Sequence, residues 1–97
     1  MIVPALNFDY NDVMFYIYII KSIKTKELYI GFTSDLDERL LAHNSSRNIA
    51  TKHTTPWEFI YVEGYKSERD ARLREKKLKH HGNSKRFVKE RVKNSLL

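Results

Sequence analysis

With 97 residues, the chain is long enough for one domain with one modest core and too short for two. Its apolar fraction of 41% excludes a disordered chain, and the lack of cysteine excludes a disulfide framework and a thiolate zinc site. No apolar run reaches transmembrane length and no signal peptide is recognisable, so we expect a cytoplasmic protein with no membrane partner.

The formal net charge of +6 is distributed unevenly. Residues 66–97 contain twelve Lys and Arg against four Asp and Glu, whereas residues 1–65 contain six against eight. A basic C-terminal third attracts polyanions and suggests contact with a nucleic-acid backbone. A solvated helix face that keeps a small protein soluble explains the same charge, and the charge alone does not decide between the two.

Residues 1–13 have no hydrophobic period and no helix cap, and we expect them to form a tail before a single domain at residues 14–97. Met14–Lys21 is predicted to be a strand whose two faces are both apolar, as in a strand buried on both sides. One face carries Phe15, Ile17 and Ile19, and the other carries Tyr16, Tyr18 and Ile20. After a polar turn at Ser22–Glu27, Leu28–Phe32 is predicted to return as the second strand of a hairpin.

The first predicted helix follows this hairpin. Ser34 is expected to cap it, with Asp37 in the capping-box position and Asn44 at its end. Leu36 and Leu40 form its buried stripe. The helix therefore has one apolar stripe to place against the sheet.

A polar, glycine-free loop at Asn44–Pro56 leads to the third predicted strand, Trp57–Tyr65. Three basic or titratable side chains in the loop are Arg47, Lys52 and His53. The alternation of the strand places Trp57, Phe59 and Tyr61 on one face and Ile60 and Val62 on the other.

Two helices are predicted after the third strand. Ser67, with Asp70 as its capping-box partner, is expected to begin a helix that runs to about His81, where Gly82 supplies a stop. A last basic helix runs from Ser84 to about Lys93, and it is expected to bury Phe87, Val88 and Val92. The order ββαβαα predicts an α+β domain in which helices flank a small three-stranded antiparallel sheet.

The chemistry concentrates on the hairpin and the helix after it. The hairpin carries Tyr16-Ile17-Tyr18 and Tyr29-Ile30-Gly31, and the helix presents Arg39 and His43 one turn apart on one face. Arg suits a phosphate and His can move a proton near neutral pH, while a glycine at position 31 leaves room for a ligand backbone. Ordinary strand packing explains each tyrosine taken singly, but their co-occurrence with Arg and His favours a phosphodiester site.

Glu75 is the other candidate. On the second-last helix, Ala71 and Leu78 mark the inward face, and Glu75 lies within about 60° of both. A carboxylate in that position either forms a salt bridge, for example with Arg39, or acts as a single ligand to Mg²⁺ or Mn²⁺. The four histidines lack the spacing of a zinc site.

These motifs resemble the GIY-YIG nuclease family over residues 14 to about 84, in its small stand-alone bacterial form. The chain is also similar to the N-terminal nuclease domain of the nucleotide-excision-repair incision subunit. Tyr29-Ile30-Gly31 matches the second family motif, and Tyr16 stands where the first motif has glycine. Residues that match the family's tyrosine, helix arginine, histidine and metal-binding glutamate are Tyr18, Arg39, His43 and Glu75. Phe32 stands where some members have lysine, and no asparagine after the glutamate helix can be assigned.

The resemblance implies an endonuclease that hydrolyses DNA phosphodiester bonds in repair or recombination, by metal-assisted attack of water and with no small-molecule cofactor. It implies that Glu75 holds Mg²⁺ or Mn²⁺ and that Arg39 binds the phosphate, with His43 beside them. Tyr18 or Tyr29 would orient or deprotonate the water. The residues expected to contact DNA are Tyr16, Gly31, Arg47, Lys52, His53, Lys85 and Lys89. The alternative is a non-catalytic nucleic-acid-binding module that keeps the fold, and the oligomeric state and the choice between DNA and RNA stay open.

Overall fold

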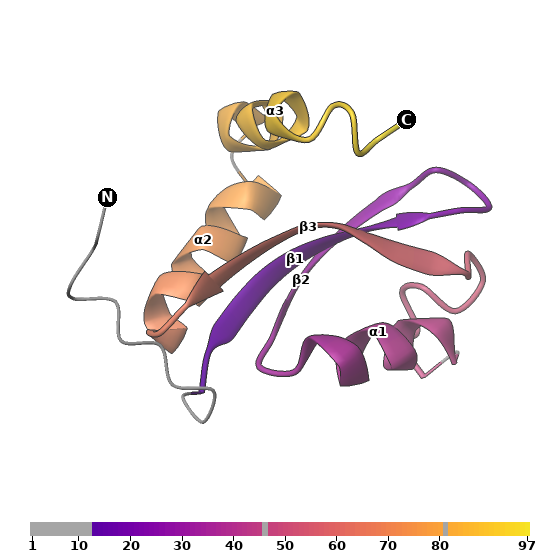
Figure 1. The fold of residues 1–97 in the computed structure, drawn as a ribbon, viewed down its shortest axis with the longest axis horizontal. Helices are drawn as coiled ribbons and strands as arrows, with labels where there is room; N and C mark the ends of the chain where they lie inside the picture. Colours follow the sequence, from indigo (N-terminus) through magenta and orange to yellow (C-terminus); the bar gives the residue numbers. More distant parts are fainter. Residues whose placement is uncertain (1–12, 46, 81) are drawn as a thin grey trace, which may run out of the picture.

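The computed structural model describes residues 13–45, 47–80 and 82–97, apart from the side chain of Lys85. Its elements are β1 (Phe15–Ser22), β2 (Leu28–Thr33), α1 (Leu36–Asn44), β3 (Trp57–Tyr65), α2 (Glu68–His80) and α3 (Gly82–Arg91). The strands form one antiparallel sheet in the order β2-β1-β3, with α1 on one face and α2 and α3 on the other (Figure 1). This confirms the predicted α+β architecture. In the described part of the chain no helix is long and apolar enough to cross a membrane, and the tail predicted for residues 1–13 lies outside it except for Val13.

The central strand, β1, is buried on both faces because helices pack against each of them. Its side chains alternate between two apolar clusters, as predicted. The cluster on the side of α2 and α3 contains Ile17, Ile19, Ala71, Leu78 and Val88. The cluster on the side of α1 contains Tyr18, Ile20 and Trp57, with Tyr29, Leu36, Leu40 and Phe59 packed against it. A 97-residue chain thus divides its apolar side chains between two small cores.

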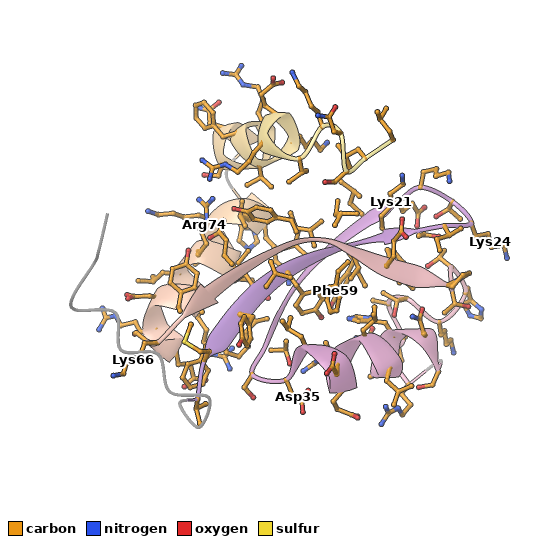
Figure 2. The ribbon with its side chains drawn as sticks, viewed as in Figure 1. Lys21, Lys24, Asp35, Phe59, Lys66 and Arg74 are labelled. Atoms are coloured by element: carbon orange, nitrogen blue, oxygen red, sulfur yellow. The ribbon has the colours of Figure 1, made fainter. Side chains whose placement is uncertain are left out.

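The edge strand β3 departs from simple alternation. Its pairing with β1 shifts between Ile19 and Ile20, which leaves Ile60 as an extra residue in a β-bulge. Phe59 packs in the cluster beside α1 (Figure 2), whereas Ile60 and Tyr61 both pack on the side of α2 and α3. The prediction that Tyr61 shares a face with Phe59 is wrong, because one inserted residue reverses the phase of the strand.

The start of α1 also differs from the prediction. Asp35, not Ser34, is the N-cap, since its Oδ1 accepts a hydrogen bond from the Glu38 backbone N–H at 3.1 Å. Thr33 Oγ1 bonds to both backbone groups of Asp35 at 3.0 Å, which extends the turn after β2 by one residue. Asp37 therefore lies in the first turn of the helix, near its positive end, and is not a capping-box partner.

The junction of α2 and α3 corrects two further expectations. Ser67 caps α2 as predicted, but Gly82 begins α3 instead of ending α2 and does not adopt a positive φ. Val88 and Val92 are buried as predicted, whereas Phe87 is 66% exposed. Because the two valines lie one turn apart and define the buried stripe, Phe87 is rotated about 100° away from it.

A polar cluster attaches α2 to β3. Arg74 of α2 (Figure 2) donates to both carboxylate oxygens of Glu63 at 3.0 and 3.1 Å. Tyr61 and Tyr65 donate to the same carboxylate. Burial opposes the charge on Glu63, but the hydrogen bonds from these three side chains outweigh it and lower the pKa of Glu63. Arg74 directly precedes Glu75, so this anchor constrains the rotation of α2 about its own axis next to Glu75.

Gly31 lies directly opposite Tyr18 in the hairpin. A Cβ placed on Gly31 would overlap the hydroxyl and ring of Tyr18. The space that was expected to admit a ligand backbone is therefore filled by the Tyr18 ring. Glycine at this position allows a large buried ring to cross the neighbouring strand.

We expect Gly31→Ala to lower the free energy of unfolding by about 1–3 kcal/mol, because the added methyl group must displace the buried Tyr18 ring. Gly82→Ala is the control, since a Cβ at Gly82 meets nothing within 4 Å, and it should change stability by less than about 1 kcal/mol. Urea denaturation followed by circular dichroism measures both. Equally small effects would show that the Tyr18 ring does not depend on Gly31.

Candidate active site

A buried chain of hydrogen bonds joins β1, α1 and the loop before β3. The Tyr18 hydroxyl lies 2.7 Å from His43 Nε2, and His43 Nδ1 lies 2.8 Å from Thr51 Oγ1. All three residues are at most 1% exposed. The Thr51 carbonyl also accepts a hydrogen bond from Trp57 Nε1 at 3.0 Å, which holds the loop against the sheet. The histidine predicted on a helix face is thus an interior group.

The helix itself explains why His43 is buried. Leu36, Leu40 and His43 are spaced four and three residues apart, so they share the stripe of α1 that faces the sheet. Both leucines pack against the cluster that contains Tyr18. His43 extends this stripe by a turn and replaces apolar contact with two hydrogen bonds.

The environment determines the charge state of this chain. Burial, together with the nearby charge of Arg39, lowers the pKa of His43, so the imidazole is neutral at neutral pH. Burial raises the pKa of Tyr18, with a further contribution from Tyr29, so the phenol keeps its proton. Among the smaller effects on this phenol, Arg39 lowers the pKa and Glu75 raises it. A neutral imidazole donates one hydrogen bond and accepts the other, so both bonds run in the same direction along the chain.

Tyr29 is the more accessible of the two phenols. It is half-buried on the same face of the sheet as Tyr18, and the two ring centres are 6.5 Å apart. Its ring centre lies 4.9 Å from that of His43 in an edge-to-face arrangement. The Nζ of Lys79, from α2, lies 5.8 Å from the centre of the same ring. Tyr29 therefore joins the buried chain to the surface and to α2.

Glu75 reaches this region from α2. Its side chain is 19% exposed, and it forms an ion pair with Lys79, one turn further along the helix, at 3.2 Å. Lys79, and not Arg39, is thus the salt-bridge partner in the described structure. Glu75 and Arg39 come from different helices, yet the charges of both act on Tyr18. The structure brings Tyr18, Tyr29, Arg39, His43 and Glu75 into one neighbourhood, and their catalytic roles stay predictions.

The donor set limits the kind of metal site that is possible. Among the described residues, no group of three or more His, Asp or Glu is arranged to hold a metal ion. A fully protein-ligated metal therefore does not fit this region. Mg²⁺ keeps several waters and is commonly held by one or two carboxylates plus phosphate oxygens, and Glu75 fits that mode.

The other residues predicted to contact DNA lie in separate places. Tyr16 is half-buried on β1, on the same face as Tyr18. Arg47 is exposed and forms an ion pair with Glu38 at 2.9 Å. Lys52 and His53 are exposed and directly follow Thr51, so the anchoring of that residue keeps them close to the buried chain.

The basic residues predicted on the last helix are not brought to this site. Lys89 is exposed on α3, which packs on the face of the sheet opposite to α1 (Figure 1). The backbone of Lys85 lies in the same helix, and its side chain is outside the described part of the chain.

Two residues of the site were not recognised from the sequence. Lys79 could have been found, because it lies four residues after Glu75 on a helix, which is the spacing of an ion pair. Thr51 carries no such pattern, since it lies in an aperiodic polar loop and meets His43 only through the fold.

Comparison with known proteins agrees with this arrangement. The sequence model of the GIY-YIG catalytic domain matches residues 14–88, which run from the residue before β1 into α3. The chain belongs to the GIY-YIG catalytic domain family. This confirms the resemblance on which the site was predicted.

This GIY-YIG domain aligns with its relatives over most of their length. A UPF0213 protein of Clostridium perfringens is 36% identical over 63 residues, which are 64% of this chain and 67% of that protein. A UPF0213 protein of Staphylococcus saprophyticus is 32% identical over 73 residues, or 74% and 88% of the two chains. A third, from Staphylococcus haemolyticus, is 34% identical over 65 residues, or 66% and 78%.

The lowered pKa of His43 predicts a pH dependence of stability. As the pH falls below about 6.5, His43 binds a proton in the unfolded chain but not yet in the folded chain. The stability that neutral His43 contributes is thus present above that pH and lost on acidification toward its folded pKa. We expect the urea midpoint to decrease as the pH is lowered from about 7.5 to about 5.5. His43→Gln should remove the part of this pH dependence that His43 causes.

His53→Gln, at an exposed histidine in the loop, is the matched control for replacing a histidine by glutamine outside the buried chain. Slopes are compared instead of absolute stabilities, because His43→Gln also alters two hydrogen bonds. Identical slopes in the parent and the His43 variant would contradict the assignment.

Proposed function

We propose that this GIY-YIG domain is an endonuclease that hydrolyses DNA phosphodiester bonds. The observation that carries the proposal is the meeting of an accessible phenol, a buried Tyr18–His43 pair and two opposite charges from separate helices. Membership of a nuclease domain family supports it. A site for DNA hydrolysis needs a cation-binding carboxylate, a phosphate-binding cation and a group that orients water, and this neighbourhood offers one of each.

Arg39 is assigned to the phosphate, because its guanidinium is permanently charged and forms paired hydrogen bonds to phosphate oxygens. Glu75 is assigned to Mg²⁺ or Mn²⁺. Such a cation, when bound, polarises the phosphate and offsets charge on the leaving oxygen. Lys79 forms an ion pair with Glu75 in this structure, and a cation held by Glu75 would compete with that ion pair.

Tyr29 is assigned to the attacking water. Tyr18 is 1% exposed and has a raised pKa, so it is a poor base and cannot meet solvent directly. Tyr29 is half-buried and packs on both Tyr18 and His43. The buried pair therefore acts as a support that fixes the direction of the Tyr29 ring, and Tyr29 hydrogen-bonds to the water.

Basic side chains border β2 and offer contacts for the DNA backbone. The Cζ of Arg72, from α2, lies 4.1 Å from the centre of the Phe32 ring, and Lys79 lies over Tyr29 further along the same strand. Lys52 lies in the loop attached to His43. Contacts of this kind bind DNA of any sequence and weaken as salt rises.

A second candidate is a module that binds nucleic acid without cutting it. The ion pair of Glu75 with Lys79 favours this candidate, because it gives the carboxylate a structural role. The two candidates differ in whether the protein cleaves DNA. In the nuclease, cleavage depends on Glu75.

Glu75→Gln should reduce cleavage by about 100-fold or more, because it removes one electrostatic contact to the reacting centre. DNA affinity should stay within about threefold, since the change removes a charge that repels phosphate. Arg39→Met should impair both. The measurement is nicking of supercoiled and branched DNA in Mg²⁺ or Mn²⁺, beside binding measured by gel shift.

Glu90→Gln is the control, because Glu90 is an exposed α3 carboxylate that also forms an ion pair with a lysine, Lys93. It should leave cleavage unchanged. Cleavage by Glu75→Gln at the parent's rate would remove the cation-binding role of Glu75. Binding by a folded parent with no cleavage in either metal would establish the binding module instead.

A further inference from the structure

A hollow lies on the opposite face of the sheet from Tyr18. It has a volume of about 740 Å³ and lies between the hairpin end of the sheet, α3 and the C-terminal segment. Each strand contributes one isoleucine to the lining, and these are Ile19, Ile30 and Ile60. The helix α3 contributes Val88. Every apolar side chain of the lining is aliphatic. Small-molecule pockets range from about 300 to about 1,000 Å³, so this hollow is large enough for a ligand.

Lys21 places a buried positive charge in this hollow. It is 6% exposed, and its Nζ donates to the Leu96 carbonyl at 2.7 Å, below the C-terminal segment (Figure 2). That bond uses one of the three ammonium protons and neutralises none of the charge. Within the described residues, no Asp or Glu carboxylate oxygen lies within 4.0 Å of Lys21 Nζ, although Glu58 is the cross-strand partner of Lys21 on β3, and no Asp or Glu lines the hollow. An ammonium group that is withdrawn from water and forms no direct ion pair is stabilised when an anion approaches it.

Two further amines increase the preference for an anion. Lys26, in the hairpin turn, and Lys89, on α3, also line the hollow. Both are exposed, so they lie at its mouth, whereas Lys21 lies inside. A ligand that entered would pass two positive charges and meet a third.

The lining also restricts the body of the ligand. Among the described residues, the lining contains no aromatic ring on which a base could stack, and no acidic, amide or hydroxyl side chain that could accept a hydrogen bond from a base. Aliphatic walls with an internal ammonium group suit an unbranched hydrocarbon tail that ends in a single anionic group.

We propose that this hollow binds a medium-chain fatty acid, with its carboxylate on Lys21 and its tail along the isoleucines of the three strands. The proposal concerns a face of the sheet that the DNA chemistry does not use. It therefore stands or falls separately from nuclease activity.

Calorimetric titration of the full chain with laurate, below its micellar concentration, tests the proposal directly. Dodecanol and dodecyltrimethylammonium carry the same tail with a neutral or a positive head. Laurate should bind about tenfold or more tightly than either, because one charge-assisted hydrogen bond contributes that much. Equal affinity for all three would overturn the proposal, and binding of dodecyl phosphate without binding of laurate would overturn the assignment of a carboxylate.

Lys21→Met keeps most of the side-chain volume and removes the charge, and it should weaken laurate binding about tenfold or more. Lys24→Met is the matched control, because Lys24 lies in the same hairpin, is exposed and is outside the lining. Leu28→Trp, at a lining residue that is 36% exposed, should reduce binding by filling the hollow with little effect on the core. Unchanged affinity in both Lys21→Met and Leu28→Trp would overturn the site.

Chemical shifts of the parent protein locate the ligand without any substitution. Laurate should shift the methyl signals of Ile30, Ile60 and Val88 and leave the ring signals of Tyr18 and His43 in place. The opposite pattern would overturn the proposal. A second copy of the chain as the occupant would appear in sedimentation as a dimer that laurate does not dissociate, and that result would overturn it as well.

Discussion

β1 has helices against both of its faces, and its alternate side chains enter two separate cores. Each core is too small to hold the chain together alone, because a domain of this size buries little apolar surface. The strand therefore couples α1 on one side to α2 and α3 on the other. A change at Ile17 acts on the core beside α2 and α3, whereas a change at Tyr18 acts on the core beside α1.

The same constraint determines the chemistry of the α1 face. Tyr18 lies in the middle of a buried strand, so its hydroxyl needs a partner in the interior, and His43 supplies it. His43 then needs a second partner, which Thr51 supplies from the loop. These two hydrogen bonds hold the loop against the sheet. Of Tyr18 and Tyr29, only Tyr29 has a phenol that solvent can reach.

The two faces of the sheet differ in polarity. On the α1 face, aromatic rings, an imidazole and charges from two helices gather around Tyr18. On the other face, aliphatic side chains surround the ammonium group of Lys21. The Glu63–Arg74 anchor connects them, because it sets the rotation of α2, which packs Leu78 on one side and directs Glu75 toward the other. A thin sheet can separate two chemistries in this way because neighbouring residues of a strand point to opposite faces.

Local pattern determined the elements and the family, since strand alternation, helix spacing and short motifs depend on residues close together in the chain. It also placed Arg39 and His43 on one helix face, and it marked Glu75 as a carboxylate near the core. Tertiary structure decided the β-bulge that turned Tyr61, the exposure of Phe87, the burial of His43 and the choice of Lys79 as the partner of Glu75. Each of these depends on which distant segments pack together and in what register, and no window of sequence contains that information.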